Sequence, residues 1–223
     1  NRHQIPKGIS NCKFEESKVN KPFNIEICAF YTIDQLSYLI RTKKIKSEDL
    51  TKMYINRLRK FGSQLECVIT ITEKMALKQA KKADIEIQNG FYRGPLHGIP
   101  YGVKDLLSVR SYKTTWGANT HKEQIINETA TVLQKLEESG AVLIAKLALG
   151  ALTWGDVWFG GKTRNPWSPS QGSSGSSAGP GSATATFDKL TRNNRDEELV
   201  CQEKMSWPNT FRRARYIPAV EYI

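Results

Sequence analysis

A helical pattern that ends at a glycine and leads straight into an apolar run constrains the fold of this chain more than any other feature. The pattern begins at Thr129 and ends at Gly140, with Val132 and Leu136 one turn apart on the same face. The apolar run at 141–145 is continuous, as in a strand that is covered on both faces. A helix that leads directly into such a strand forms an α/β unit. The pattern therefore predicts an α/β fold with a mainly parallel or mixed sheet.

The chain before this unit is expected to be mostly helical. Residues 1–30 are polar and show no clear period, which indicates an irregular lead-in. The elements expected after it are a short helix behind a capping box at 32–35, a helix at 47–61 that Ser47 caps and Gly62 ends, a strand at 68–71 and a helix at 72–89.

The chain is basic, and the surplus lies mainly in these helices. Lys and Arg number 33 against 22 Asp and Glu, a formal net charge of +11, and residues 1–90 hold 17 of the basic and 10 of the acidic side chains. Acidic residues lie among the basic clusters, and aromatic residues do not alternate with them as a stacking platform for bases requires. We therefore interpret the basic residues as a solvated face and expect no nucleic-acid partner.

Composition excludes several further classes of protein. Hydrophobic residues make up 39% of the chain, which is enough for a core, and no apolar run approaches the roughly 20 residues of a membrane-spanning helix. The four cysteines form no C-x-x-C pair, so we expect neither a cysteine metal site nor a cofactor bound through one. Their spacing is compatible with free thiols and with two disulfides.

Lys104 is the first candidate for chemistry. It follows a stretch rich in glycine and proline at 94–102 and stands between Val103 and Leu106 in an apolar context. Loss of hydration among apolar groups disfavours the ammonium form, and an uncharged lysine can act as a general base. The alternative is a surface lysine at the end of a strand.

The second candidate is the serine- and glycine-rich block at 171–183. By composition it could be a flexible linker. However, Ala178 and Ala183 suit close packing, and only 38 residues follow Ala185, which is few for an independent domain. We therefore expect a packed segment.

Taken together, these motifs resemble the amidase signature family. The resemblance rests on the string P-L-H-G-I-P-x-G-V-K-D at 95–105, the helix and G-A-V-L-I-A-K unit that ends at Lys146, the string T-R-N-P-W at 163–167 and the serine-glycine block. It implies α/β/α layers around a mixed sheet, here incomplete and preceded by helices. It also divides the chain into an irregular lead-in at 1–30, a partial amidase domain at 31–185 and a tail at 186–223 that resembles a non-adjacent, later part of the family.

The resemblance also implies an activity, a substrate class and a catalytic triad. Family members hydrolyse the C–N bond of carboxylic amides of small molecules with a Ser–Ser–Lys triad and no cofactor, and some supply ammonia as subunits of tRNA-linked amidotransferases. Lys104 matches the general base, and Ser173 matches the bridging serine, which a cis peptide bond would hold in place. Ser174 would support the lysine by a hydrogen bond.

The chain departs from the family pattern after the serine-glycine block. The nucleophilic serine belongs to a motif D-[IL]-G-G-S-[IV]-R, and no G-G-S string follows Ser182. We interpret this as an internal deletion near Ala185 and predict that the chain is inactive. The alternatives are a non-catalytic pseudoenzyme that binds a ligand or partner, a relative of the ammonia-supplying amidotransferase subunits, and nucleic-acid binding by the basic helices.

Overall fold

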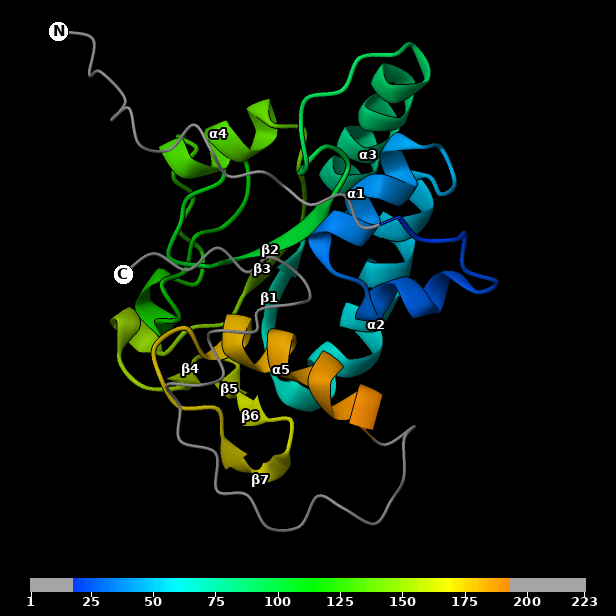
Figure 1. The fold of residues 1–223 in the computed structure, drawn as a ribbon. Helices are drawn as coiled ribbons and strands as arrows, with labels where there is room; N and C mark the ends of the chain where they lie inside the picture. The colour runs from blue at the N-terminus through cyan, green and yellow to red at the C-terminus, as the bar shows by residue number, and fades with distance from the viewer. Residues whose placement is uncertain (1–17, 193–223) are drawn as a thin grey trace, which may run out of the picture.

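A computed structural model describes residues 18–192 as layers of helices around a small sheet (Figure 1). The α-helices in this range are α1 (Ile33–Arg41), α2 (Ser47–Leu65), α3 (Glu73–Gln88), α4 (Thr131–Glu138) and α5 (Ala178–Arg192). The strands are β1 (Val68–Ile71), β2 (Pro100–Lys104), β3 (Val142–Leu147), β4 (Val157–Trp158), β5 (Gly161–Lys162), β6 (Arg164–Asn165) and β7 (Ser168–Gly172). Short 3-10 helices are η1 (Ile25–Phe30), η2 (Asn119–His121) and η3 (Ala151–Thr153).

The strand predicted from the apolar run is the middle strand of the main sheet. The strand order is β1-β3-β2, with β2 parallel and β1 antiparallel to β3. Every residue of β2 and of β3 is buried. The α/β class with a mixed sheet is therefore confirmed.

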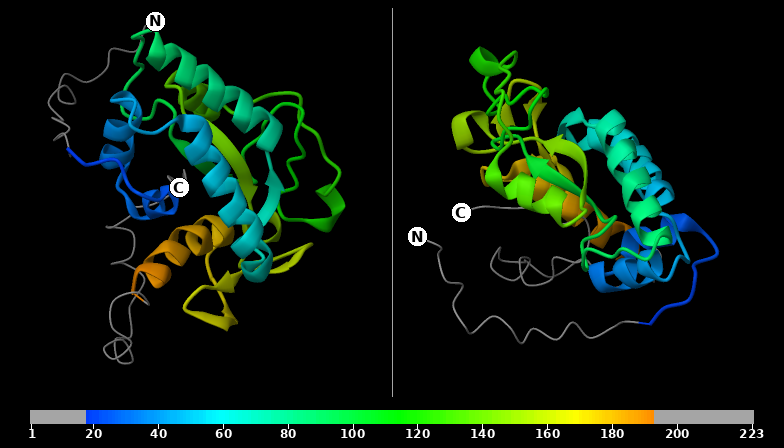
Figure 2. Two further views of the ribbon diagram at one scale, coloured as in Figure 1. Left: turned by 90° about the vertical axis from the view of Figure 1, so that its right-hand side faces the viewer. Right: turned by 90° about the horizontal axis from the view of Figure 1, so that it is seen from above.

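The two faces of this sheet are covered by different helices. One core cluster joins α1, α2 and α3 to Val142 and Ile144 of β3, and the other joins α4 to Leu143 of β3 and Val103 of β2. Figure 2 shows α2 and α3 together on one side of the strands. The alternation of side chains along β3 thus produces an α/β/α arrangement.

The predicted end of α2 was wrong, and packing explains why. Gly62 lies inside the helix, which continues to Leu65 and ends at Glu66 in the left-handed conformation, with φ of 49°. A Cβ on Gly62 would lie 2.7 Å from Cγ2 of Val68. The glycine therefore permits close approach of β1 to the helix and does not terminate it.

The predicted cap of α2 was wrong as well. Ser47 is the first helical residue, and its hydroxyl donates to the carbonyl oxygen of Gly98 at 2.7 Å. The carboxylate of Asp84 on α3 accepts from the backbone N–H groups of Ser47 and Glu48, at 2.7 and 3.0 Å. A carboxylate from a neighbouring helix thus caps the N-terminus of α2, where the sequence predicted a cap by the local serine.

The helix and strand starts before β2 lie close to their predicted positions. The capping box of Thr32 and Gln35 is present with both hydrogen bonds, and β1 covers the predicted 68–71. The helix expected from Thr129 begins at Thr131. Part of the expected irregular lead-in forms η1, which Asn24 caps, while residues 1–17 lie outside the described part.

The serine-glycine block is a packed turn and helix. It leads from β7 into α5, which runs past Ala185 to Arg192; the rest of the expected tail, 193–223, lies outside the described residues. Gly179 donates its N–H to the carbonyl of Ala148 at 2.8 Å, and the buried Ser182 hydroxyl donates to the carbonyl of Arg164 at 2.7 Å. The first turn of α5 therefore lies directly against the chain that follows β3.

Candidate active site

Lys104 lies at the end of β2 and points to the beginning of α5. Its side chain is buried, with 6% of the residue exposed. Its Nζ donates to Oγ of Ser176 at 2.8 Å and to Oγ of Ser177 at 3.0 Å. The predicted lysine therefore does meet serine hydroxyls, and the interpretation of Lys104 as a surface lysine was wrong.

The structure does not bring Lys104 to the two serines that the resemblance implied. The hydroxyl of Ser173 is buried and has no hydrogen-bond partner among the described residues. The backbone N–H of Ser173 donates to the carbonyl of Thr163 at 2.9 Å, which continues the β6–β7 hairpin. Ser174 is exposed, and its backbone N–H donates to Oδ2 of Asp156 at 3.0 Å.

The backbone between the two serine pairs explains the difference. Ser174 and Gly175 are consecutive left-handed residues, with φ of 63° and 67°, and they turn the chain sharply after the hairpin. The next two residues, Ser176 and Ser177, thereby reach the amine. The expected cis peptide bond is absent from the described residues. The block contains two Ser-Ser pairs, and only the second precedes an Ala-Gly helix start, a signal that the sequence interpretation missed.

The start of α5 adds an electrostatic contribution to the site. The carbonyl of Ser177 accepts the helical hydrogen bond from Gly181 at 3.0 Å, so both serines stand at the helix N-terminus. The partial positive charge of that terminus disfavours a second positive charge beside it.

A buried ion pair lies next to Lys104 along the chain. Nζ of Lys146 lies 2.6 Å from Oδ1 of Asp105, and both side chains are fully buried. Burial lowers the pKa of Lys146 from its ordinary value, while the Asp105 carboxylate acts in the opposite direction. This pair was not identified from the sequence as part of a site.

Two acidic residues hold the hairpin segment that carries the serine turn. Glu66 accepts the N–H of Lys162 on its carboxylate at 2.6 Å and the hydroxyl of Thr163 on its carbonyl at 2.8 Å. Asp156 accepts from Ser174 as described above. Asp156 thus holds the serine turn itself, and Glu66 holds the preceding segment at 162–163.

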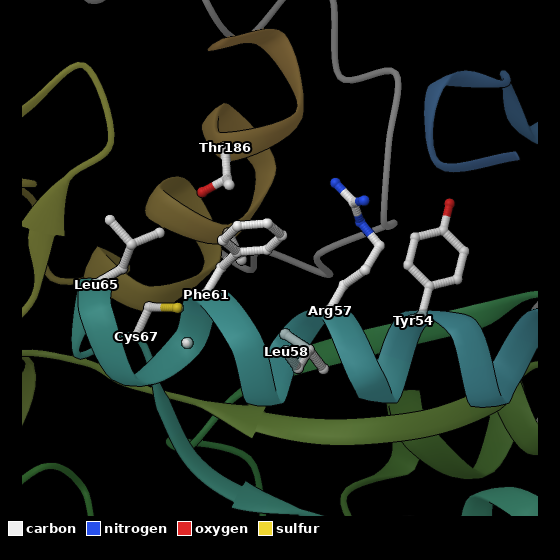
Figure 3. A pocket seen from close by; sticks show the side chains of 9 residues that line it. Tyr54, Arg57, Leu58, Phe61, Leu65, Cys67 and Thr186 are labelled. Carbon is white, nitrogen blue, oxygen red and sulfur yellow. The ribbon is translucent and has the colours of Figure 1, made fainter. Parts of the chain in front are cut away.

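One hollow among the described residues is separate from Lys104. It lies between α2 and α5, and its volume of about 320 Å³ includes space that is open to solvent (Figure 3). Its walls are mainly apolar, with the Arg57 guanidinium at one end; the lining residues are Tyr54, Arg57, Leu58, Phe61, Gly62, Leu65, Cys67, Ala183 and Thr186. Neither Lys104 nor a serine of the turn lines it.

The described residues contain no group of three or more His, Cys, Asp or Glu side chains placed to hold a metal ion. Within the same range, no helix has both the length and the apolar character that a membrane crossing needs. The hydrogen bonds that Lys104 donates to Ser176 and Ser177 bring together an amine and two hydroxyls. Such a set can accept, hold and return protons.

Comparisons with known proteins cover the part of the chain that contains Lys104 and the serine turn. The sequence profile of the family described as Amidase matches residues 49–188. A glutamyl-tRNA(Gln) amidotransferase subunit from Thermoanaerobacter pseudethanolicus is 35% identical over 159 residues, which cover 69% of this chain and 32% of that protein. The protein of the same name from Methylobacillus flagellatus is 32% identical over 158 residues, 70% of this chain and 32% of its own length.

A solved structure is similar over the same region. The native peptide amidase from Stenotrophomonas maltophilia aligns with a TM-score of 0.64 and 30% identity, covering 69% of this chain and 34% of that one. The chain thus spans about a third of the length of the relatives that it matches.

Proposed function

Because this chain belongs to the amidase family, we propose that Lys104 and Ser176 are the proton-handling part of a site that hydrolyses carboxylic amides. The observation that carries the proposal is the 2.8 Å contact between the amine of the buried Lys104 and the partly exposed hydroxyl of Ser176. In this proposal Ser176 takes the bridging role that the motif pattern had assigned to Ser173. Ser177 supports the amine through its own hydrogen bond.

The chemistry follows from the order of these groups. The uncharged amine of Lys104 accepts the proton of Ser176, which in turn accepts the proton of an attacking hydroxyl. The attacking oxygen bonds to the amide carbonyl carbon, the C–N bond breaks, and the proton passes to the leaving nitrogen. Water then cleaves the resulting acyl ester by the same proton route, releasing the carboxylic acid.

We further propose that this chain does not complete the reaction by itself. The sequence contains no glycine after Gly181, so neither the G-G-S motif of the nucleophile nor a glycine-rich turn for the oxyanion is present downstream. A fluorophosphonate, which acylates activated serines, is expected to leave the chain unlabelled. Labelling at Ser176, Ser177 or Ser182 that disappears in Lys104→Ala would contradict this part of the proposal.

A chimeric protein tests the proposed activity directly. Residues 186–223 would be replaced by the matching remainder of the Stenotrophomonas maltophilia peptide amidase, and ammonia release from primary carboxamides would be measured. Lys104→Met and Ser176→Ala are expected to lower kcat by about 10²–10⁴-fold, the usual contribution of a general base. Ser173→Ala is the matched control and is expected to retain activity. Loss of activity in Ser173→Ala, with retention in Ser176→Ala, would overturn the assignment.

A second candidate function is supported by the names of the relatives. Several are called glutamyl-tRNA(Gln) amidotransferase subunits, which favours a chain that supplies amide nitrogen within a larger assembly. Ammonia release by the chimera from glutamine in preference to other carboxamides would support this function. A preference for other amides would support the simple hydrolase, and binding of carboxamides without hydrolysis would support the pseudoenzyme.

A further inference from the structure

We infer that Asp105 and Lys146 are positioning residues for Lys104. Their buried ion pair controls where Lys104 lies and whether its amine carries a charge. This inference rests on the proposed function only in assigning Lys104 a catalytic task; the coupling itself is a property of the described fold. Lys104 donates to the two serine hydroxyls, whereas the ion pair begins one residue further along the chain, at Asp105, so the pair acts through Lys104.

Each member of the pair makes further hydrogen bonds. Nζ of Lys146 donates to the carbonyl of Lys113 at 2.5 Å and to the hydroxyl of Thr114 at 2.7 Å. Oδ2 of Asp105 accepts from the backbone N–H of Thr115 at 2.8 Å and from its hydroxyl at 2.5 Å. Two fully buried charges therefore fix a loop of three residues, 113–115, against the ends of β2 and β3.

The same pair fixes the end of β2, where Lys104 lies. In the parallel register, Val103 is opposite Lys146 and Lys104 is opposite Leu147. The backbone N–H of Asp105 donates to the carbonyl of Leu147 at 2.9 Å, so the ladder extends one residue beyond Lys104. Because side chains alternate along a strand, Lys146 and Lys104 point to opposite faces of the sheet. The pair therefore holds the end of β2 from the face of the sheet opposite the Lys104 amine.

The charged groups on the neighbouring elements can be named. Apart from these three residues, β2, β3 and the described side chains of α5 carry no charged group, while Asp156 at the serine turn and Arg164 on β6 are charged side chains on the segments next to α5. The intact pair is neutral as a whole. Removal of one partner would leave a single buried charge near Lys104 without its ion-pair partner.

The expected effects have opposite signs. Asp105→Asn leaves the Lys146 ammonium, which disfavours a second positive charge and lowers the titration midpoint of Lys104. Lys146→Met leaves the Asp105 carboxylate, which favours the ammonium form and raises the midpoint. For unit charges roughly 10 Å apart at an effective dielectric constant of about 20, each shift is about one pH unit, a tenfold change in the protonation equilibrium.

The experiment follows the ¹³Cε resonance of Lys104 in lysine-labelled protein as pH is raised, with Lys104→Met identifying the signal. The titration midpoint is expected to be lowest in Asp105→Asn and highest in Lys146→Met. The double variant Asp105→Asn/Lys146→Met is expected to lie between them, close to the unsubstituted chain. Glu86→Gln, which breaks the partly buried ion pair with Arg93 on another part of the fold, is the control and should leave the midpoint unchanged.

The order can be tested with any of these variants that folds. Each remaining partner keeps two hydrogen bonds in the single variants, and the double variant leaves no unpaired buried charge. Equal midpoints in the unsubstituted chain and a folded single variant, single variants that move in the same direction, or a double variant displaced by a full pH unit would overturn the inference. These outcomes do not depend on hydrolysis, so failure of the inference is distinct from failure of the proposed function.

Discussion

Substitution of Gly179 by alanine is expected to separate the serine turn from Lys104. A Cβ at this position would lie 2.4 Å from the backbone N of Ala148 and 2.6 Å from the carbonyl oxygen of Cys67. Both neighbours are backbone atoms that cannot rotate away. The first turn of α5 must therefore move outward, and Ser176 and the Lys104 amine would move apart.

The magnitude follows from two opposing contributions. Alanine is favoured over glycine inside a helix by about 1 kcal/mol. Overpacking of a close contact costs about 1–3 kcal/mol, and contact with backbone places this site at or above the upper end. The expected net loss in the free energy of unfolding is about 2 kcal/mol.

Urea denaturation followed by circular dichroism measures this loss. Gly62→Ala is the matched control, because it is also helical but its Cβ would meet the end of the Val68 side chain, which can adjust. There the helix preference offsets most of the contact, and we expect a change within about 1 kcal/mol of zero. A Gly179→Ala chain as stable as the unsubstituted one would refute the close packing of α5.

Three further predictions concern buried groups. Lys146→Met should lower the free energy of unfolding by about 3–5 kcal/mol in urea, whereas the double variant with Asp105→Asn should lose clearly less; equal losses would contradict a buried ion pair. Burial lowers the pKa of His97 below its ordinary value of 6.5. The stability that this buried, neutral imidazole contributes is therefore complete above pH 6.5. It is lost as pH falls toward the pKa of the folded state, because only the unfolded chain then binds the proton. Urea midpoints measured across this range should fall less steeply in His97→Gln, and an unchanged slope would refute the assignment. Burial raises the pKa of Cys28 to about 11 and of Cys67 to about 12, so both thiols should resist alkylation at pH 8 until the chain is unfolded, as peptide mass spectrometry would show.

Much of the fold could be predicted because its signals are local. The apolar run at 141–145 identified the central strand, and the capping box at Thr32 identified the start of α1. The end of α2 could not be predicted, because Gly62 serves a contact with Val68, a residue that is brought close only by the fold. The cap of that helix comes from Asp84, which lies 37 residues along the chain from Ser47.

The site was predicted in part for the same reason. Lys104 was identified from its apolar context and the surrounding motif. The partner serines depend on how far the chain turns at Ser174 and Gly175, and left-handed conformations at two successive residues do not follow from composition. The ion pair of Asp105 with Lys146 joins residues on neighbouring strands, so only the register of β2 and β3 reveals it.

The contact between Lys104 and Ser176 can be tested most directly by NMR titration of the Lys104 ¹³Cε signal in two serine variants of the chain. Ser176→Ala removes a hydrogen-bond acceptor from the amine and is expected to shift both the resonance and its titration midpoint. Ser173→Ala removes a hydroxyl that has no partner among the described residues and is expected to leave both unchanged. A response to Ser173→Ala alone would contradict the account, because it would place the amine beside the other serine pair.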